Sequence, residues 1–341
     1  MTMRAVFYTG RNQLEHRETV MPELTGPEEV VVKVKYAGIC GTDLSIMAGK
    51  HPRARAPLIM GHEFSGEVYR SNSAREDLKE GAKVVVEPLI TCGTCYACRS
   101  GYSYVCQNLK LYGIDAPGAF AEYVKIPSDR VFAIPADIPF DIAAHIEPAA
   151  VAVHAVRLSS LKVGDVVCVQ GAGPIGLMTA IIARQAGPQE VIICEKEPFR
   201  VQMARRFGLT VIDVNTSDSV DEVNKITQGR GADIVFEVAG APQTVLASPQ
   251  LCRVRGEIIA VAIPKEPRPY DIVGLTFKEL TVKGVRVYAP FDFERAIQIV
   301  ARLGEDLAAL ITPPFALPDA TAAFEKAAGG QGVMRVLFKI A

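Results

Sequence analysis

Residues 165–176, DVVCVQGAGPIG, decide the fold of this chain. A run of apolar residues is followed by Gly171, Gly173 and Gly176, and the apolar segment 175–186 then has the length of a helix. The glycines permit a sharp turn and let the backbone approach a pyrophosphate at the helix N-terminus. A strand, a G-x-G-x-x-G turn and a helix together therefore predict a dinucleotide-binding unit.

The acidic residue that such a unit requires is Glu195, nineteen residues after Gly176 and at the end of the next predicted strand, 190–194. A carboxylate at this position can accept hydrogen bonds from the adenosine ribose and would repel a 2′-phosphate. The sequence therefore favours NAD over NADP. Lys196 and Arg200 weaken this preference, because both side chains can reach a phosphate.

Strand and helix patterns alternate through residues 149–288, which predicts βαβ units and a doubly wound parallel sheet. The predicted strands are 165–170, 190–194, 232–238 and 256–261, and the clearest helices are 175–186 and 199–207. This segment forms the expected cofactor domain of an α/β protein.

Residues 1–148 have a different character. Short β-branched runs at 30–35, 64–69 and 83–87 are separated by Pro and Gly, which predicts an antiparallel, barrel-like domain. Beyond residue 289, a helix at 292–303 precedes a closing strand at 334–340 that can return to this first domain. The predicted domains are therefore 1–148 with 289–341, and 149–288.

Composition narrows the class of protein. A length of 341 residues is typical of about two domains. The formal charge of −1, with no basic stripe, argues against nucleic acid and anionic membranes. The longest apolar run, 175–183, is far shorter than the roughly 20 residues that cross a bilayer. We find no secretory leader and expect a cytoplasmic protein.

The eight cysteines fall into distinct groups. Four of them lie within fifteen residues, and clustered thiolates with no open position are typical of structural zinc. These are Cys92, Cys95, Cys98 and Cys106. Cys168, Cys194 and Cys252 lie in apolar runs and are expected to be small buried side chains.

Cys40 stands between glycines and precedes His62-Glu63 by 22 residues. A thiolate, an imidazole and a carboxylate form a three-ligand set that suits zinc with one position left open. Glu147 is a carboxylate in an apolar stretch, and its burial is unfavourable without a partner such as a metal or a metal-bound water. An ordinary carboxylate at a helix N-terminus is the alternative interpretation of Glu147.

The order of these motifs is similar to that of zinc-dependent medium-chain alcohol dehydrogenases, and the resemblance extends over essentially the whole chain. It rests on AGICGTD at 37–43, GHE at 61–63, the four-cysteine segment and GAGPIG at 171–176. The segment EPAAVAVH at 147–154 resembles the polyol (sorbitol) and butanediol dehydrogenase branch. The length and the Cys/His/Glu pattern also resemble L-threonine dehydrogenase.

The resemblance implies a GroES-like, mainly-β catalytic domain and a Rossmann domain, with the chemistry in the cleft between them. It implies that Cys40, His62 and Glu63 hold a catalytic zinc, with Glu147 as a fourth ligand or a partner of the zinc water. The implied reaction passes a hydride from a secondary alcohol to NAD, with zinc as Lewis acid and Thr42 and Ser45 relaying the proton. The cofactor contacts that we predict are Gly171, Gly173, Pro174, Ile175, Gly176, Glu195, Arg200 and Ile263. Family members imply a homotetramer or a dimer.

Two features depart from the family pattern. Many relatives carry histidine where this chain has Ser45, so the proton would leave through water or through His51. Sorbitol dehydrogenases place Arg-Tyr after Gly-Val, whereas this chain has GVRVY at 284–288. Two alternatives therefore stand beside a polyol dehydrogenase: an L-threonine 3-dehydrogenase, and a non-catalytic protein that binds zinc and a dinucleotide.

Overall fold

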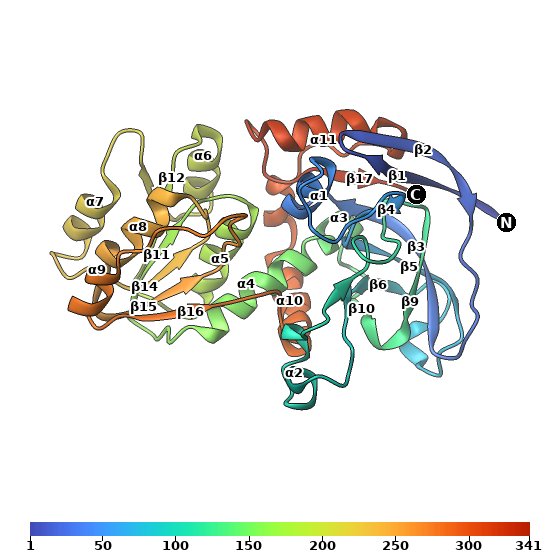
Figure 1. The fold of residues 1–341 in the computed structure, drawn as a ribbon, viewed down its shortest axis with the longest axis horizontal. Coiled ribbons are helices and arrows are strands. Elements are labelled where there is room, and N and C mark those ends of the chain that lie inside the picture. Colours follow the sequence, from blue (N-terminus) through green and yellow to red (C-terminus); the bar gives the residue numbers. More distant parts are fainter. The chain divides into compact units, whose positions relative to one another are not determined.

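The computed structural model describes residues 1–341, except for the side chain at position 305, and it divides into two compact units. Unit 1 comprises Met1–Glu147 and Ala289–Ala341, and unit 2 comprises Pro148–Tyr288. Both chain ends therefore belong to unit 1, as Figure 1 shows. Helix α4 (Ile146–Leu158) begins in the last residues of the first segment and continues into unit 2.

Unit 2 is built on a six-stranded parallel sheet with the strand order β13-β12-β11-β14-β15-β16 (Figure 1). This confirms the predicted Rossmann-type sheet. Its strands are β11 (Val166–Gln170), β12 (Glu190–Glu195), β13 (Thr210–Asp213), β14 (Ala232–Glu237), β15 (Cys252–Ala260) and β16 (Thr281–Gly284). Its further helices are α5 (Pro174–Gln185), α6 (Pro198–Arg206), α7 (Ser219–Ile226), α8 (Pro242–Leu251) and α9 (Ile272–Phe277).

The central strands of unit 2 are continuous apolar runs because a parallel sheet is covered on both faces. Every residue of β11 and β14 is buried. Cys168, Cys194 and Cys252 lie in one apolar cluster of this core, as predicted. Strand β15 begins at Cys252, before the predicted start at Gly256. Its first part contains exposed residues and the left-handed Arg255 (φ 56°), so it shows no apolar pattern from which a strand could be predicted.

Unit 1 contains mainly antiparallel strands in three sheets, with the orders β2-β1-β4, β10-β6-β5-β3-β17 and β7-β8, and β9 also pairs with β3. The strands are β1 (Thr2–Gly10), β2 (Gln13–Val20), β3 (Glu29–Gly38), β4 (Leu58–Ile59), β5 (Glu63–Ser71), β6 (Lys83–Val86), β7 (Leu89–Ile90), β8 (Lys110–Leu111), β9 (Tyr123–Pro127), β10 (Val131–Ala133) and β17 (Leu337–Lys339). The helices are α1 (Gly41–Met47), α2 (Tyr96–Arg99), α3 (Phe140–Ala143), α10 (Pro290–Leu303) and α11 (Ala320–Gly329).

The two segments of unit 1 share one sheet and one core. Strand β17 pairs antiparallel with β3, so the predicted return of the C-terminal strand is confirmed. Phe120, Phe324 and Phe338 are buried together, and the Phe120 ring centroid lies 4.9 Å from that of Phe338 and 6.0 Å from that of Phe324. Within the described part of the chain, no helix has both the length and the apolar character needed to cross a bilayer.

Candidate active site

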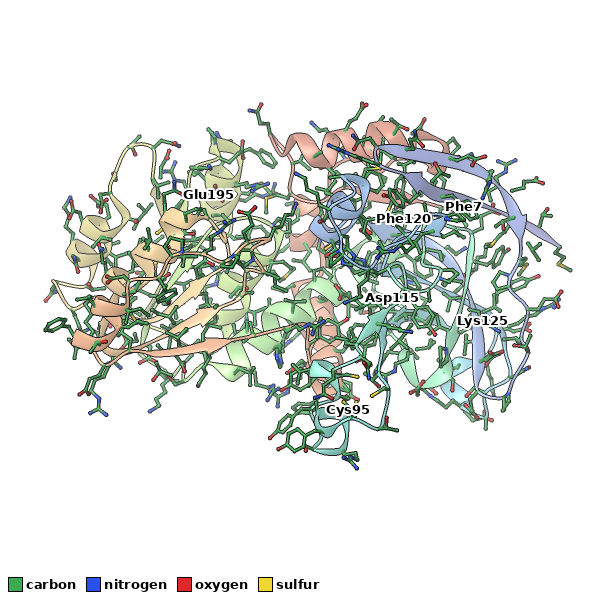
Figure 2. All side chains as sticks on the ribbon, in the orientation of Figure 1. Phe7, Cys95, Asp115, Phe120, Lys125 and Glu195 are labelled. Carbon is green, nitrogen blue, oxygen red and sulfur yellow. The ribbon has the colours of Figure 1, made fainter. Side chains whose placement is uncertain are left out.

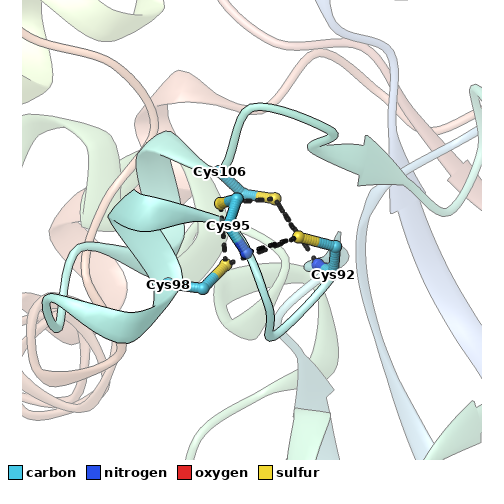
Figure 3. Close-up of side chains that lie close together, drawn as sticks. All are labelled: Cys92, Cys95, Cys98 and Cys106. Atoms are coloured by element: carbon cyan, nitrogen blue, oxygen red, sulfur yellow. Dashed lines mark hydrogen bonds between the residues drawn. The ribbon is translucent and has the colours of Figure 1, made fainter.

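The four clustered cysteines converge on one point of the segment around helix α2 (Figure 3). Their sulfur atoms are 3.5 Å apart for Cys95–Cys98 and for Cys92–Cys106, 3.9 Å for Cys95–Cys106 and 4.0 Å for Cys92–Cys98. A tetrahedral ion with Zn–S bonds of about 2.3 Å would hold its sulfurs about 3.8 Å apart. The arrangement therefore fits a four-thiolate zinc site.

Backbone amides donate hydrogen bonds to sulfur atoms of this cluster and stabilise their thiolate form. Hydrogen bonds from the backbone of Thr94 and Cys95 lower the pKa of Cys92 to about 5, and the amide of Asn108 donates to Cys106 Sγ over 3.3 Å. Burial raises the pKa of Cys98 to about 12. Thiolate at all four positions thus requires a cation among them, which is what a metal would supply.

A second group joins Cys40, His62 and Glu63, whose ligand atoms lie within 4.8 Å of one another. Cys40 is the N-cap of α1, and Glu63 is the first residue of β5, where it pairs with Gly38 of β3. His62 and Glu63 are buried, whereas Cys40 is half-buried. The tight turn after Cys40 and the register of β3 with β5 bring the three side chains together.

The backbone before His62 is held by glycines. Gly61 has φ +93°, and a Cβ at Gly118 would lie 2.5 Å from Gly113 Cα and 2.6 Å from the Met60 carbonyl. Ala119 donates its amide to the Gly61 carbonyl over 2.9 Å. Only residues without side chains allow these two backbone segments to approach this closely, so the segment 113–119 fixes the position of His62.

Asp43 lies next to Cys40 and His62, and the sequence analysis gave it no role at this site. It is fully buried; its Oδ2 accepts from the Cys40 amide over 2.9 Å, and its Oδ1 lies 3.8 Å from His62 Nδ1. Burial raises the pKa of Asp43 to about 6 and also raises the pKa of Cys40. Burial opposes protonation of His62, but the carboxylate of Asp43 and the sulfur of Cys40 raise its pKa well above the ordinary value. Asp43 Oδ1 and His62 Nδ1 are buried and have no hydrogen-bond partner among the described residues, which fits a cation bound close to them.

Arg335 is a further member that the sequence did not indicate. Its Nη2 lies 2.8 Å from Glu63 Oε2, both side chains are 5 % exposed, and the same nitrogen donates to the Ala144 carbonyl over 3.1 Å. Arg335 therefore holds one carboxylate oxygen of Glu63 and balances its charge. It comes from the C-terminal segment, so no motif spacing connects it to Glu63.

The other predicted residues of this region are placed as follows. Thr42 and Ser45 lie half-buried on α1. Glu147 is buried in the first turn of α4 and lies outside the group of three. His51 Nδ1 accepts the backbone amide of Ala54 over 3.2 Å, and burial lowers the pKa of this histidine. The occupied ring nitrogen makes His51 a poor acceptor for a substrate proton.

In unit 2, the glycine loop has the geometry that a pyrophosphate site needs. Gly171 has φ +100°, and Gly173 is the N-cap of α5, with Pro174 in the first turn beside Ile175. A Cβ at Gly176 would collide with the Gly171 carbonyl, so the loop can pass over the helix start only with glycine there. The N-terminal amides of α5 are thereby left accessible to an anion.

Glu195 lies next to this loop, where Figure 2 labels it. Its Oε2 accepts the amide of Ala172 over 2.7 Å, and its Oε1 accepts the amides of Lys196 over 2.7 Å and Glu197 over 2.9 Å. The carboxylate therefore joins the glycine loop, through the amide of Ala172, to the turn that follows β12, through the amides of Lys196 and Glu197. Arg200 Nη1 lies 3.6 Å from the Cβ position of Gly173, and its buried Nε has no partner among the described residues. Ile263 is 77 % exposed.

Comparison with known proteins places both units in known families. Residues 26–136 match the model of the alcohol dehydrogenase GroES-like domain, and residues 174–302 match that of the zinc-binding dehydrogenases. The chain is 37 % identical to a 2-dehydro-3-deoxy-L-galactonate 5-dehydrogenase from Pseudoalteromonas atlantica, covering 91 % of each chain. It is 36 % identical to an L-threonine 3-dehydrogenase from Bacillus subtilis, covering 92 % of each. A zinc-binding dehydrogenase from Sinorhizobium meliloti, solved with bound NADP, superposes with a TM-score of 0.93 at 32 % identity, covering 99 % of each chain.

Proposed function

This chain belongs to the zinc-dependent medium-chain alcohol dehydrogenase family, and from that premise we propose that it oxidises a secondary hydroxyl of a polyol or sugar-derived compound to a ketone, with NAD as the hydride acceptor. The observation that carries the proposal is the group of Cys40, His62 and Glu63 in unit 1. Its thiol, imidazole and carboxylate are the donors of a zinc site with an open position. The glycine loop of unit 2 supplies the cofactor site.

Each predicted site residue of unit 1 has a role in this proposal. Cys40, His62 and Glu63 hold the catalytic zinc, and Glu147 is a fourth ligand or orients a water beside it. Bound zinc supplies Lewis acidity, which lowers the pKa of an alcohol. Thr42 accepts the hydroxyl proton and Ser45 passes it to water, because a serine hydroxyl can transmit a proton although it cannot store one near neutral pH. The four-cysteine cluster holds a second, structural zinc.

We propose NAD as the preferred cofactor because Glu195 stands where a 2′-phosphate would meet its negative charge. Against this, Arg200 has an unpartnered buried nitrogen beside the loop, and the Sinorhizobium meliloti relative binds NADP. A Glu195→Gln variant tests the balance. We expect the ratio of kcat/KM for NAD over NADP to fall in the variant; an unchanged ratio would show that Glu195 only braces the loop.

The substrate is tested by NADH formation with a panel of sugar alcohols, sugar acids and butanediol beside L-threonine. Threonine is the second candidate because a 36 % identical relative is named for that activity. If L-threonine is oxidised and none of the polyols is, threonine becomes the first candidate substrate. Cys40→Ser should abolish turnover, whereas Cys252→Ser, a matched change of a fully buried thiol in unit 2, should retain it. Unchanged turnover in Cys40→Ser would refute the proposed site.

Metal analysis separates catalysis from a purely binding role. Two zinc ions per chain, one of them lost in Cys40→Ser, support the dehydrogenase. One zinc per chain, retained in Cys40→Ser, supports a protein that only binds zinc and a dinucleotide. We also propose a cytoplasmic location, because two thiol-containing metal sites require reduced cysteines.

We further propose a homo-oligomer whose first contact is the β16 edge of the unit 2 sheet. Strand β16 ends the sheet, and an unpaired edge strand is a template for pairing with another strand. Beside it, Ile272, Val273 and Phe277 of α9 are 62 %, 64 % and 85 % exposed. An apolar patch next to a strand edge suits a two-fold contact with a second copy. Phe277→Glu should dissociate it, as measured by sedimentation.

A further inference from the structure

The parallel sheet of unit 2 has one point at which its connections change direction. From β11 the chain continues through β12 to β13 on one side, and from β14 it continues through β15 to β16 on the other. In open parallel sheets, ligands bind beyond the carboxyl ends of the two strands that flank such a point. The glycine loop follows β11, so the turn after β14, residues 238–241, is the second border of the proposed cofactor site.

The turn after β14 lies close to the glycine loop and is held in one conformation. A Cβ at Gly171 would lie 3.2 Å from the Cβ of Ala239. Gly240 has φ +65°, and its amide donates to Glu237 Oε1 over 2.8 Å. The hydroxyl of Thr244, in α8, donates to the same oxygen over 2.7 Å. A side chain that is fixed to this turn therefore stands beside the loop that would hold the pyrophosphate.

Arg268 is fixed to this turn, and the sequence analysis gave it no role. Its Nε donates to the Gly240 carbonyl over 3.2 Å, and its side chain is half-buried. Among the described residues, Arg268 has no ion-pair partner, and its two terminal nitrogens donate no hydrogen bond. Arg268 stands between Pro267 and Pro269, which restrict the backbone on both sides of it. The chain thus holds a guanidinium, whose planar donors match phosphate oxygens, in a pre-organised position.

We propose that Arg268 is a further cofactor-binding residue, whose terminal guanidinium nitrogens bind the pyrophosphate of the dinucleotide. The inference rests on the proposed cofactor site, in which the N-terminal amides of α5 bind the same anion. Glu195 and Arg200 belong to the β12 side of the glycine loop, whereas Arg268 follows β15 on the other side. NAD and NADP carry the same pyrophosphate, so Arg268 strengthens the binding of both equally, and the choice between them is left to the residues on the β12 side.

The test measures the dissociation constants of NAD, NADP and ADP-ribose for the full-length protein by isothermal titration calorimetry. We expect Arg268→Ala to weaken all three by the same factor, about tenfold or more, because ADP-ribose lacks nicotinamide but keeps the pyrophosphate. Arg268→Lys keeps the charge without the planar fork and should recover part of the loss. Arg206→Ala, which removes an exposed arginine at the far end of α6, should bind all three like wild type. Thermal unfolding of each variant checks that it is folded.

Three results would overturn the pyrophosphate contact. Unchanged dissociation constants in Arg268→Ala would show that the guanidinium does not reach the cofactor. A loss confined to NADP, or to NAD and NADP without ADP-ribose, would place the contact on the 2′-phosphate or on the nicotinamide half. A lysine variant that binds no better than the alanine variant would show that the positive charge plays no part. In each case wild type still binds NAD and the proposed function stands, whereas a wild type that binds none of the three ligands would refute the proposed function itself.

Discussion

His145 makes the stability of unit 1 sensitive to acid, and the size of the effect follows from its surroundings. The side chain is fully buried between α3 and α4, with Nδ1 3.3 Å from the Asp141 carbonyl and no partner for Nε2 among the described residues. Burial, followed by the positive charge of Arg335, lowers the pKa of His145 to about 3. In the unfolded chain a histidine has a pKa of about 6.5.

The sign of the effect follows from these two pKa values. As the pH falls below about 6.5, the unfolded chain gains a proton that the folded protein does not accept until about pH 3, so stability is lost across this window. Between about pH 7 and about pH 5, the loss from this one group is about 2 kcal/mol. His145→Leu removes the titrating ring while keeping an apolar side chain in the site.

Urea unfolding of wild type and His145→Leu at the two pH values isolates this contribution. The substitution can change the free energy of unfolding at neutral pH by any amount. Between about pH 7 and about pH 5, we expect the free energy of unfolding of the variant to rise by about 2 kcal/mol relative to that of wild type. The difference between variant and wild type is compared at the two pH values, so the contributions of the other titrating groups, which both proteins share, cancel. An equal difference at both pH values would refute the account of a neutral, buried imidazole.

Substitutions at three further positions test the packing of unit 1. Arg335→Met should cost the metal-free protein about 3–5 kcal/mol in urea unfolding, because Glu63 stays buried without its partner, and less with zinc added; an equal loss in both states would contradict this. Gly118→Ala should cost about 1–3 kcal/mol in thermal unfolding and weaken retention of one zinc, since its Cβ meets Gly113; wild-type stability would contradict the close backbone approach. Phe120→Ala should cost about 3–5 kcal/mol and Phe120→Leu less; equal losses in the two variants would argue against a packing role.

Much of unit 2 could be predicted because its information is local. The strand, glycine loop and helix around Gly171 lie in one short segment, and parallel strands buried on both faces are plain apolar runs. The four-cysteine cluster was equally predictable, since three of its cysteines are separated by only two residues each and can therefore turn onto one ion. Helix α1 shows no periodic pattern of its own, because the seven residues that follow Cys40 are too few to reveal one.

The features that were missed depend on distant parts of the chain or on backbone geometry. Arg335 reaches Glu63 only because the C-terminal segment folds back and β17 pairs with β3. No short motif therefore connects the two residues in the sequence. The ribose contact of Glu195 stays a prediction, whereas its hydrogen bonds to the amides of Ala172, Lys196 and Glu197 depend on the path of the backbone and could not be read from its residue type. The role of Asp43 beneath His62 likewise depends on how α1 is oriented.

The pairing of β17 with β3 has a consequence for biosynthesis. Phe338 is fully buried in unit 1, yet the ribosome adds it only after the whole of unit 2. The nascent chain can complete the continuous segment Pro148–Tyr288 while the first unit still lacks a strand and part of its core. A polypeptide that stopped before β17 would therefore contain a whole cofactor unit but a first unit that lacks one of its strands.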